Sequence, residues 1–112
     1  MNHESQIDIP PSFMALFLPP GQIKPTLGHK EMAARYELCE DLAQLLTEQA
    51  ALMQSQLGIT EELVLQQCEA GLVNEPSVVS APEARWVVCR LAELLQWPMV
   101  HLLPAAEQAP QR

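Results

Sequence analysis

A single long amphipathic stretch, from about Lys30 to Leu57, constrains the fold of this chain more than any other feature. Apolar residues return along it at the spacing of an α-helix, while Glu37, Asp41 and Glu48 gather near the opposite side. A helix over these residues is about 40 Å long. Its apolar arc is too broad for one narrow seam, which predicts contact with two neighbours. The arc consists of Leu38, Cys39, Leu42, Leu45, Leu46, Ala50, Leu52, Met53 and Leu57.

Two further helices are predicted from start and stop signals. Gly58 ends the long helix, and Thr60 caps a second one that runs over residues 60–70 and stops at Gly71. Ser80 and Glu83 form a capping box for a third helix at 81–97, which the following proline ends. Because the connections are short, neighbouring helices are expected to run antiparallel.

The segment IPPSFMALFLPPG at residues 9–21 lies between two proline pairs, which exclude a long helix there. It is read as an extended segment or one helical turn. The sequence therefore predicts an all-α fold: a compact bundle of three main helices at about 30–57, 60–70 and 81–97, with an extended N-terminal segment packed on it. Residues 1–8 are expected to be a mobile N-terminus, 9–103 a single domain, and 104–112 a frayed C-terminal tail.

Charge and composition exclude several classes of function. The 112 residues suffice for one domain, and their 14 acids and 6 bases give a net charge of −8. Such a chain repels nucleic acid and anionic lipid, because both bind through Lys and Arg. We expect no signal peptide and no membrane span. Three scattered cysteines are typical of reduced thiols, which predicts a cytoplasmic protein.

The sequence contains no recognisable catalytic, nucleotide-binding or metal-binding motif. The four glycines do not form a phosphate-binding loop, and the histidines and cysteines lack metal-ligand spacing, so no cofactor is expected. Glu37 and Asp41 could hold a divalent ion, but a solvated acidic face is the better interpretation. Cys39 and Cys68 lie on apolar arcs and are expected in the core. Cys89 lies on a less apolar face and is the one candidate for a reactive thiol.

Interface-type residues are the strongest functional signal. Trp86, Arg90 and Trp97 share one face of the third predicted helix, and Trp and Arg often anchor interfaces. Phe13 and Phe17 are the only phenylalanines, and both lie in the bracketed segment. These aromatic residues either pack within the fold or bind a partner.

Arg35 is the most unusual charge, since it projects near the centre of the apolar arc of the long helix. Its long stem could let it reach solvent near the helix start. Alternatively, its guanidinium is paired or faces a ligand, and a carboxylate could then bind it through two hydrogen bonds.

Four stretches, IPPSFMALFLPPG, AARYELCEDLAQLL, LGIT and PEARWVVCRLAELLQW, together resemble small proteobacterial proteins of unknown role that carry the inherited label "ATPase with chaperone activity". The resemblance covers residues 7–97. The sequence contradicts the ATPase half of that label, because it has no nucleotide-binding motif and is short for an ATPase domain. The resemblance implies at most a helper or adaptor of a larger machine, and it supplies no catalytic residues.

The leading hypothesis is therefore a non-enzymatic cytoplasmic protein–protein interaction module, an adaptor or chaperone-like helper of a larger complex. The alternative is a homodimeric regulatory or structural protein that buries its extra apolar face against itself. A thiol- or metal-dependent enzyme that uses Cys89 or the Glu37/Asp41 side ranks third. The expected partner is another protein or a second copy, not nucleic acid or a membrane.

Overall fold

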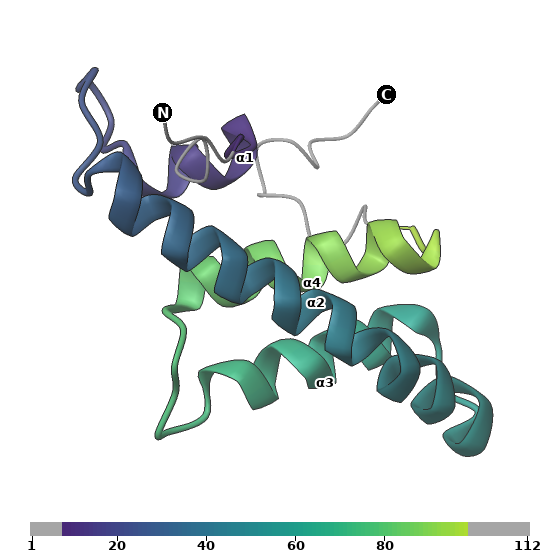
Figure 1. Ribbon diagram of the computed structural model, residues 1–112. Coiled ribbons are helices and arrows are strands. Elements are labelled where there is room, and N and C mark those ends of the chain that lie inside the picture. The colour runs from purple at the N-terminus through teal and green to yellow at the C-terminus, as the bar shows by residue number, and fades with distance from the viewer. Residues whose placement is uncertain (1–7, 99–112) are drawn as a thin grey trace, which may run out of the picture.

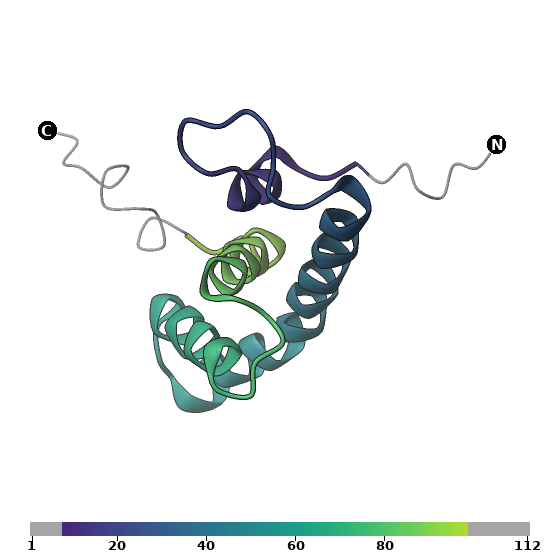
Figure 2. The same cartoon turned by 90° about the vertical axis from the view of Figure 1, so that its left-hand side faces the viewer.

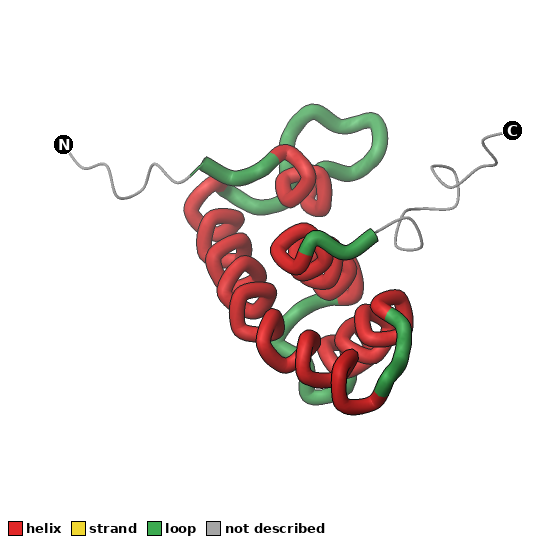
Figure 3. The backbone as a smooth tube through the Cα atoms, turned by 90° about the vertical axis from the view of Figure 1, so that its right-hand side faces the viewer, coloured by secondary structure: helices red, strands yellow, loops and turns green. Residues whose placement is uncertain are grey.

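The structure, a computed structural model, describes residues 8–98, and all regular structure in that range is helical (Figures 1 and 3). The predicted all-α class is confirmed. In chain order the elements are α1 (Pro11–Met14), the 3₁₀ turn η1 (Ala15–Phe17), α2 (His29–Leu57), α3 (Glu61–Val73) and α4 (Ala81–Leu95). The predictions for residues 1–7, 99–103 and the C-terminal tail lie outside the described residues.

The helix ends follow the predicted signals, with two differences. Gly58 adopts the left-handed conformation that ends α2, at φ 65°, and the Thr60 hydroxyl accepts a hydrogen bond from the Leu63 N–H at the start of α3. However, α3 continues through Gly71 to Val73, because the packing of Leu72 against the core outweighs the weak helix preference of one glycine. Helix α4 ends at Leu95, since Gln96 is left-handed and a residue before proline disfavours helix.

Helix α4 lies in the middle of the bundle. Figure 2 shows the N-terminal segment on one side of α4 and α3 on the other, while α2 runs along all three. The most extensive contact between helices joins α2 to α4. Small, fully buried side chains line that contact, which lets the two helix backbones approach each other. They are Cys39, Ala43 and Ala50 on α2, with Ala84 and Ala92 on α4.

The core has two parts. One lies between the N-terminal segment, the first half of α2 and the start of α4, with Phe13 and Val87 fully buried. The other joins α3 to α4, with Val64 and Leu91 fully buried. Leu46 and Leu72 contact both parts, so the two form one continuous interior. Three main helices therefore pack together as predicted.

The N-terminal segment is helical, so of the two predicted conformations one helical turn is confirmed and the extended segment is wrong. Pro11 is at the first position of α1, where proline is tolerated, and the N–H groups of Phe13 and Met14 both donate to the Pro10 carbonyl at 3.0 Å. The prolines that exclude a long helix thus start a short one. The segment does pack on the bundle, because the Phe13 side chain is 0% exposed.

The broad apolar arc of α2 is only partly covered. Its buried side is centred on Cys39, Ala43 and Ala50, whereas Leu45 is 74% exposed, Leu52 51% and Leu57 65%. The predicted contact with two neighbours is confirmed, because α2 packs against both α3 and α4, but they do not cover the whole arc. Both α3 and α4 pack on one side of the arc, and its other side faces solvent.

Candidate interaction surface

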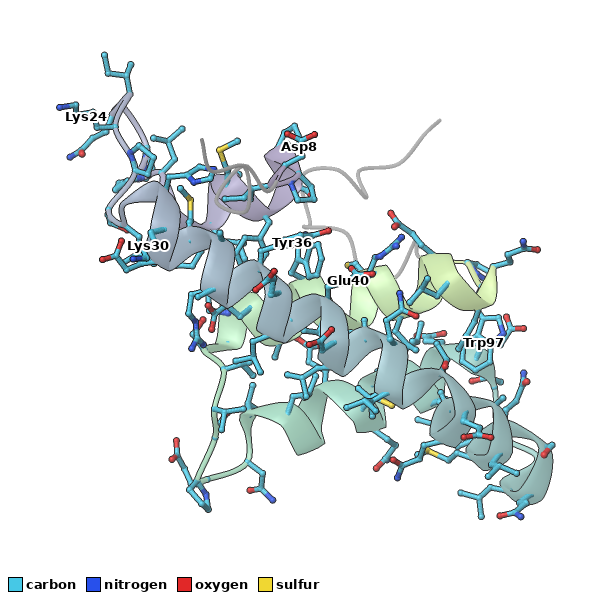
Figure 4. The ribbon with its side chains drawn as sticks, in the orientation of Figure 1. Asp8, Lys24, Lys30, Tyr36, Glu40 and Trp97 are labelled. Atoms are coloured by element: carbon cyan, nitrogen blue, oxygen red, sulfur yellow. The ribbon has the colours of Figure 1, made fainter. Side chains whose placement is uncertain are left out.

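Four aromatic rings meet where α1, α2 and α4 converge. The Phe13 ring centroid lies 5.1 Å from that of Trp86, 5.5 Å from that of Phe17 and 5.7 Å from that of Tyr36, mostly edge to face. Figure 4 shows Tyr36 between the N-terminal segment and α4. Such pairs add stability beyond the area that they bury. The cluster is therefore a structural contact between the N-terminal segment and the bundle.

Two of the predicted partner-binding residues, Phe13 and Trp86, are thus used inside the fold. Trp86 is 9% exposed, and its Nε1–H donates to the Ser12 hydroxyl at 3.0 Å. Phe17 is half-buried beside Phe13, and its carbonyl accepts from the Thr26 N–H at 2.6 Å. Sequence reasoning missed Tyr36, which lies outside the apolar arc on the helical wheel. The sequence signal that could have pointed to Tyr36 is an aromatic residue close to the start of the long helix, which follows the segment that holds both phenylalanines.

Arg35 is a paired guanidinium, and its partner belongs to the same chain. Its Nε donates to Glu83 Oε2 at 2.8 Å, and its Nη2 donates to Glu83 Oε1 at 2.6 Å and to the Val78 carbonyl at 2.8 Å. Burial by itself raises the pKa of Glu83, but the hydrogen bonds from Arg35 and Ser80 outweigh it and hold that pKa below its usual value. Arg35 is therefore a structural contact between α2 and α4.

Arg90 forms a second pair between the same two helices. Its Nε and Nη2 donate to the Glu40 carboxylate at 2.9 and 3.1 Å, and its Nη1 donates to Glu93 at 3.1 Å. These hydrogen bonds lower the pKa of Glu40. Figure 4 shows Glu40 on the side of α2 that faces α4. Arg90 is thus also engaged within the fold, and it leaves no free charge for a partner.

Trp97 and Cys89 belong to the α3 end of the core. Both are half-buried and pack against that part. Figure 4 shows Trp97 at the end of α4, far from the aromatic cluster. Burial raises the pKa of the Cys89 thiol, so at neutral pH it is protonated and a poor nucleophile. Cys39 and Cys68 are buried, as expected from the apolar arcs.

An apolar stripe, uncovered over most of its length, runs along the outer side of α2. Leu38, Leu45 and Leu52 recur two turns apart. Leu38 is half-buried and packs against the core, whereas Leu45 is 74% exposed and Leu52 51%. Exposed carboxylates of Glu37, Asp41 and Glu48 follow one edge of the stripe. These six residues are called the outer face of α2 below. Helical spacing alone places the three leucines on the apolar arc, where buried contacts were expected.

The candidate surface thus differs from the predicted one. Of the six predicted partner-binding residues, none contributes an exposed side chain. The most exposed large apolar side chains are instead Leu45, Leu52 and Leu57 on α2 and Ile23 and Val78 in loops, all more than half exposed. Within residues 8–98, no three His, Cys, Asp or Glu side chains group as metal ligands. In the same range, no helix is both long and apolar enough to cross a bilayer.

Comparison of the chain with protein-family models, with curated proteins and with solved structures gives no match. The resemblance to the small proteobacterial proteins therefore stays an expectation from the sequence. Any argument about function rests on the chain's own surface.

Proposed function

We propose that this chain is a non-enzymatic cytoplasmic protein–protein interaction module, an adaptor or chaperone-like helper, that binds its partner through the outer face of α2. The observation that supports this most strongly is the exposure of Leu45 and Leu52, at 74% and 51%, on one side of a long helix. Single exposed leucines are ordinary, but aligned ones on a rigid helix are typical of docking surfaces.

The remaining chemistry of the described chain favours a binding role over a catalytic one. Three arginines, Arg35, Arg85 and Arg90, lie in ion pairs with glutamates of the same chain. The Cys89 thiol has a raised pKa, which is the opposite of what a nucleophilic cysteine needs. These groups serve the fold, whereas the exposed side chains of Leu45 and Leu52 on the outer face of α2 are not used by it.

Affinity capture tests the proposal with a matched pair of variants. The double variant Leu45→Gln/Leu52→Gln removes two exposed apolar side chains from the outer face. The control Ile23→Gln/Val78→Gln removes two others, which are 94% and 65% exposed and lie in loops. Both variants should keep the helical circular dichroism and the urea midpoint of the parent, because all four side chains are exposed.

Tagged chains would be incubated with a lysate of the cells in which the gene is native. The parent and the control should recover the same partner, and the outer-face variant should lose it. Equal recovery by all three chains contradicts the proposal.

The homodimer remains the second candidate, because the same exposed leucines could be buried against a second copy. Light scattering at high micromolar concentration distinguishes it. If the parent is a dimer and the Leu45→Gln/Leu52→Gln variant is a monomer, the result supports self-association through this face. A monomeric parent contradicts the homodimer hypothesis.

A further inference from the structure

We infer that the outer face of α2 receives a basic amphipathic helix of another protein, with apolar residues on the leucine stripe and Lys or Arg beside the acidic edge. This inference rests on the proposed function and names the class of partner.

The shape of the stripe favours a helix. Leu38, Leu45 and Leu52 repeat every two turns along one continuous helix, α2. A partner helix that presents apolar residues at the same repeat places them between these leucines, as in helix-in-groove recognition and in coiled coils. From Leu38 to Leu52 the stripe is about 20 Å long, so a partner helix of four turns covers it.

The charge beside the stripe favours a basic partner. Glu37, Asp41 and Glu48 are exposed, and within residues 8–98 none of them is in an ion pair. The chain as a whole carries a net charge of −8. A basic helix is therefore attracted at long range and neutralises the edge on contact, whereas an acidic helix is repelled.

A second copy fits the same face less well. An antiparallel pair that places Leu45 against its equivalent also places Glu48 against Leu42 of the second copy, next to that copy's Asp41. Like charges then face each other, which is unfavourable. A parallel pair places the acidic edge beside Leu42 and Gln49 of the second copy, and neither carries a positive charge.

The chain's own C-terminal apolar run also lacks the required charge. The sequence MVHLL at 99–103 is apolar but contains no Lys or Arg. It could supply only the apolar half of the contact and would leave the acidic edge without a counter-charge.

The test uses a designed peptide as the probe. A fluorescent helical peptide of about 20 residues carries Leu at heptad spacing with Lys on both flanks, and a second peptide has Glu in place of each Lys. Binding to the full chain is followed by fluorescence anisotropy at low and at high NaCl. The Lys peptide should bind and the Glu peptide should not, and high salt should weaken binding several-fold.

Two pairs of variants separate the apolar and the charged contributions. Leu45→Gln/Leu52→Gln should weaken the Lys peptide at least tenfold, while Ile23→Gln/Val78→Gln should bind as the parent does. Asp41→Asn/Glu48→Gln should weaken it about three- to tenfold, since each rim charge contributes modestly. The matched control Asp8→Asn/Glu75→Gln, which neutralises two exposed acids elsewhere, should have a much smaller effect.

Each other outcome contradicts the inference. Equal binding of the Lys and Glu peptides, or no loss in the outer-face variants, overturns it. Self-association of the parent that the Leu45→Gln/Leu52→Gln variant abolishes assigns the face to a second copy. The Leu102→Gln/Leu103→Gln variant removes apolar side chains from the C-terminal residues. If the full chain with this variant binds the Lys peptide tenfold more tightly, those residues compete for the outer face and are its occupant.

The two proposals can fail separately. If captured partners depend on Leu45 and Leu52 but the Lys peptide does not bind, the interaction function stands and the partner is not a basic helix.

Discussion

Arg35 and Glu83 connect the start of α2 to the first turn of α4 through one shared carboxylate. Glu83 Oε1 accepts from Arg35 Nη2 at 2.6 Å and from the Ser80 N–H at 2.9 Å, while Oε2 accepts from Arg35 Nε at 2.8 Å. The residue is 3% exposed. One buried side chain therefore closes the capping box of α4 and also fixes α4 against α2.

Glu83→Gln should lower the free energy of unfolding by about 2 kcal/mol. The amide keeps one acceptor oxygen but loses the charge and the two-bond geometry that the guanidinium requires. Urea denaturation followed by circular dichroism measures the change. Glu93→Gln is the control, because Glu93 pairs with Arg90 at the surface and 53% of its side chain is exposed. This variant should change the free energy of unfolding by less than about 0.5 kcal/mol. Equal shifts in the two variants would contradict this account.

Stability should fall when the solution becomes acidic, because Glu83 and Glu40 have pKa values below the usual one. Above the unfolded-state pKa of about 4.3, both carboxylates are ionised in either state and the contribution is complete. As the pH falls below that value, the unfolded chain binds protons first, and the contribution is lost as the pH passes through the lower folded-state pKa. Urea midpoints between about pH 7 and about pH 3 measure this.

The variants Glu83→Gln and Glu40→Gln should each show a shallower loss of stability with acid than the parent, because one linked carboxylate is gone. If both variants keep the acid dependence of the parent, these two pairs do not cause it.

Phe13→Ala should destabilise the fold by about 3–5 kcal/mol, the usual cost of truncating a buried phenylalanine. Phe13 is 0% exposed and contacts three other rings, so its removal leaves a cavity between the N-terminal segment and the bundle. Met14→Ala, at a neighbouring side chain that is 37% exposed, should cost less than about 1 kcal/mol. Similar urea midpoints for both variants would mean that the segment is not part of the core.

Local signals predicted most of the helices. The capping residues Thr60 and Ser80 and the left-handed Gly58 act within a few residues of the chain, so their effect is visible in sequence. The continuation of α3 through Gly71 was missed, and the choice between an extended segment and a helical turn after Pro11 was left open. In both cases tertiary packing, by Leu72 and by Phe13, decides between conformations that the local sequence allows.

The candidate surface was harder to predict, because periodicity gives the apolar arc of a helix but not which part of it a neighbour covers. Helical spacing places both Arg35 and Leu45 on the apolar arc of α2 and predicts equal burial for them. In the structure Arg35 is bound to Glu83 on α4, and Leu45 faces solvent. The small side chains of Cys39 and Ala43 are 0% exposed and lie on the side of α2 that packs against the rest of the bundle. Helical spacing alone does not show which side of an apolar arc has side chains small enough to let a neighbouring helix approach closely.

The three cysteines should react with a thiol reagent in a defined order. Burial raises the pKa of all three thiols, that of Cys39 to about 12, so the nucleophilic thiolate is scarce at neutral pH. Cys89 is half-buried and should react first, whereas Cys39 and Cys68 are buried and should react only when the fold opens. In the folded chain Cys89 should still react at least tenfold more slowly than in urea. The variant Cys89→Ser should remove the fastest phase and leave the slow ones. A folded-state rate for Cys89 equal to its rate in urea would show an accessible thiolate, and it would favour the thiol-dependent enzyme over the interaction module.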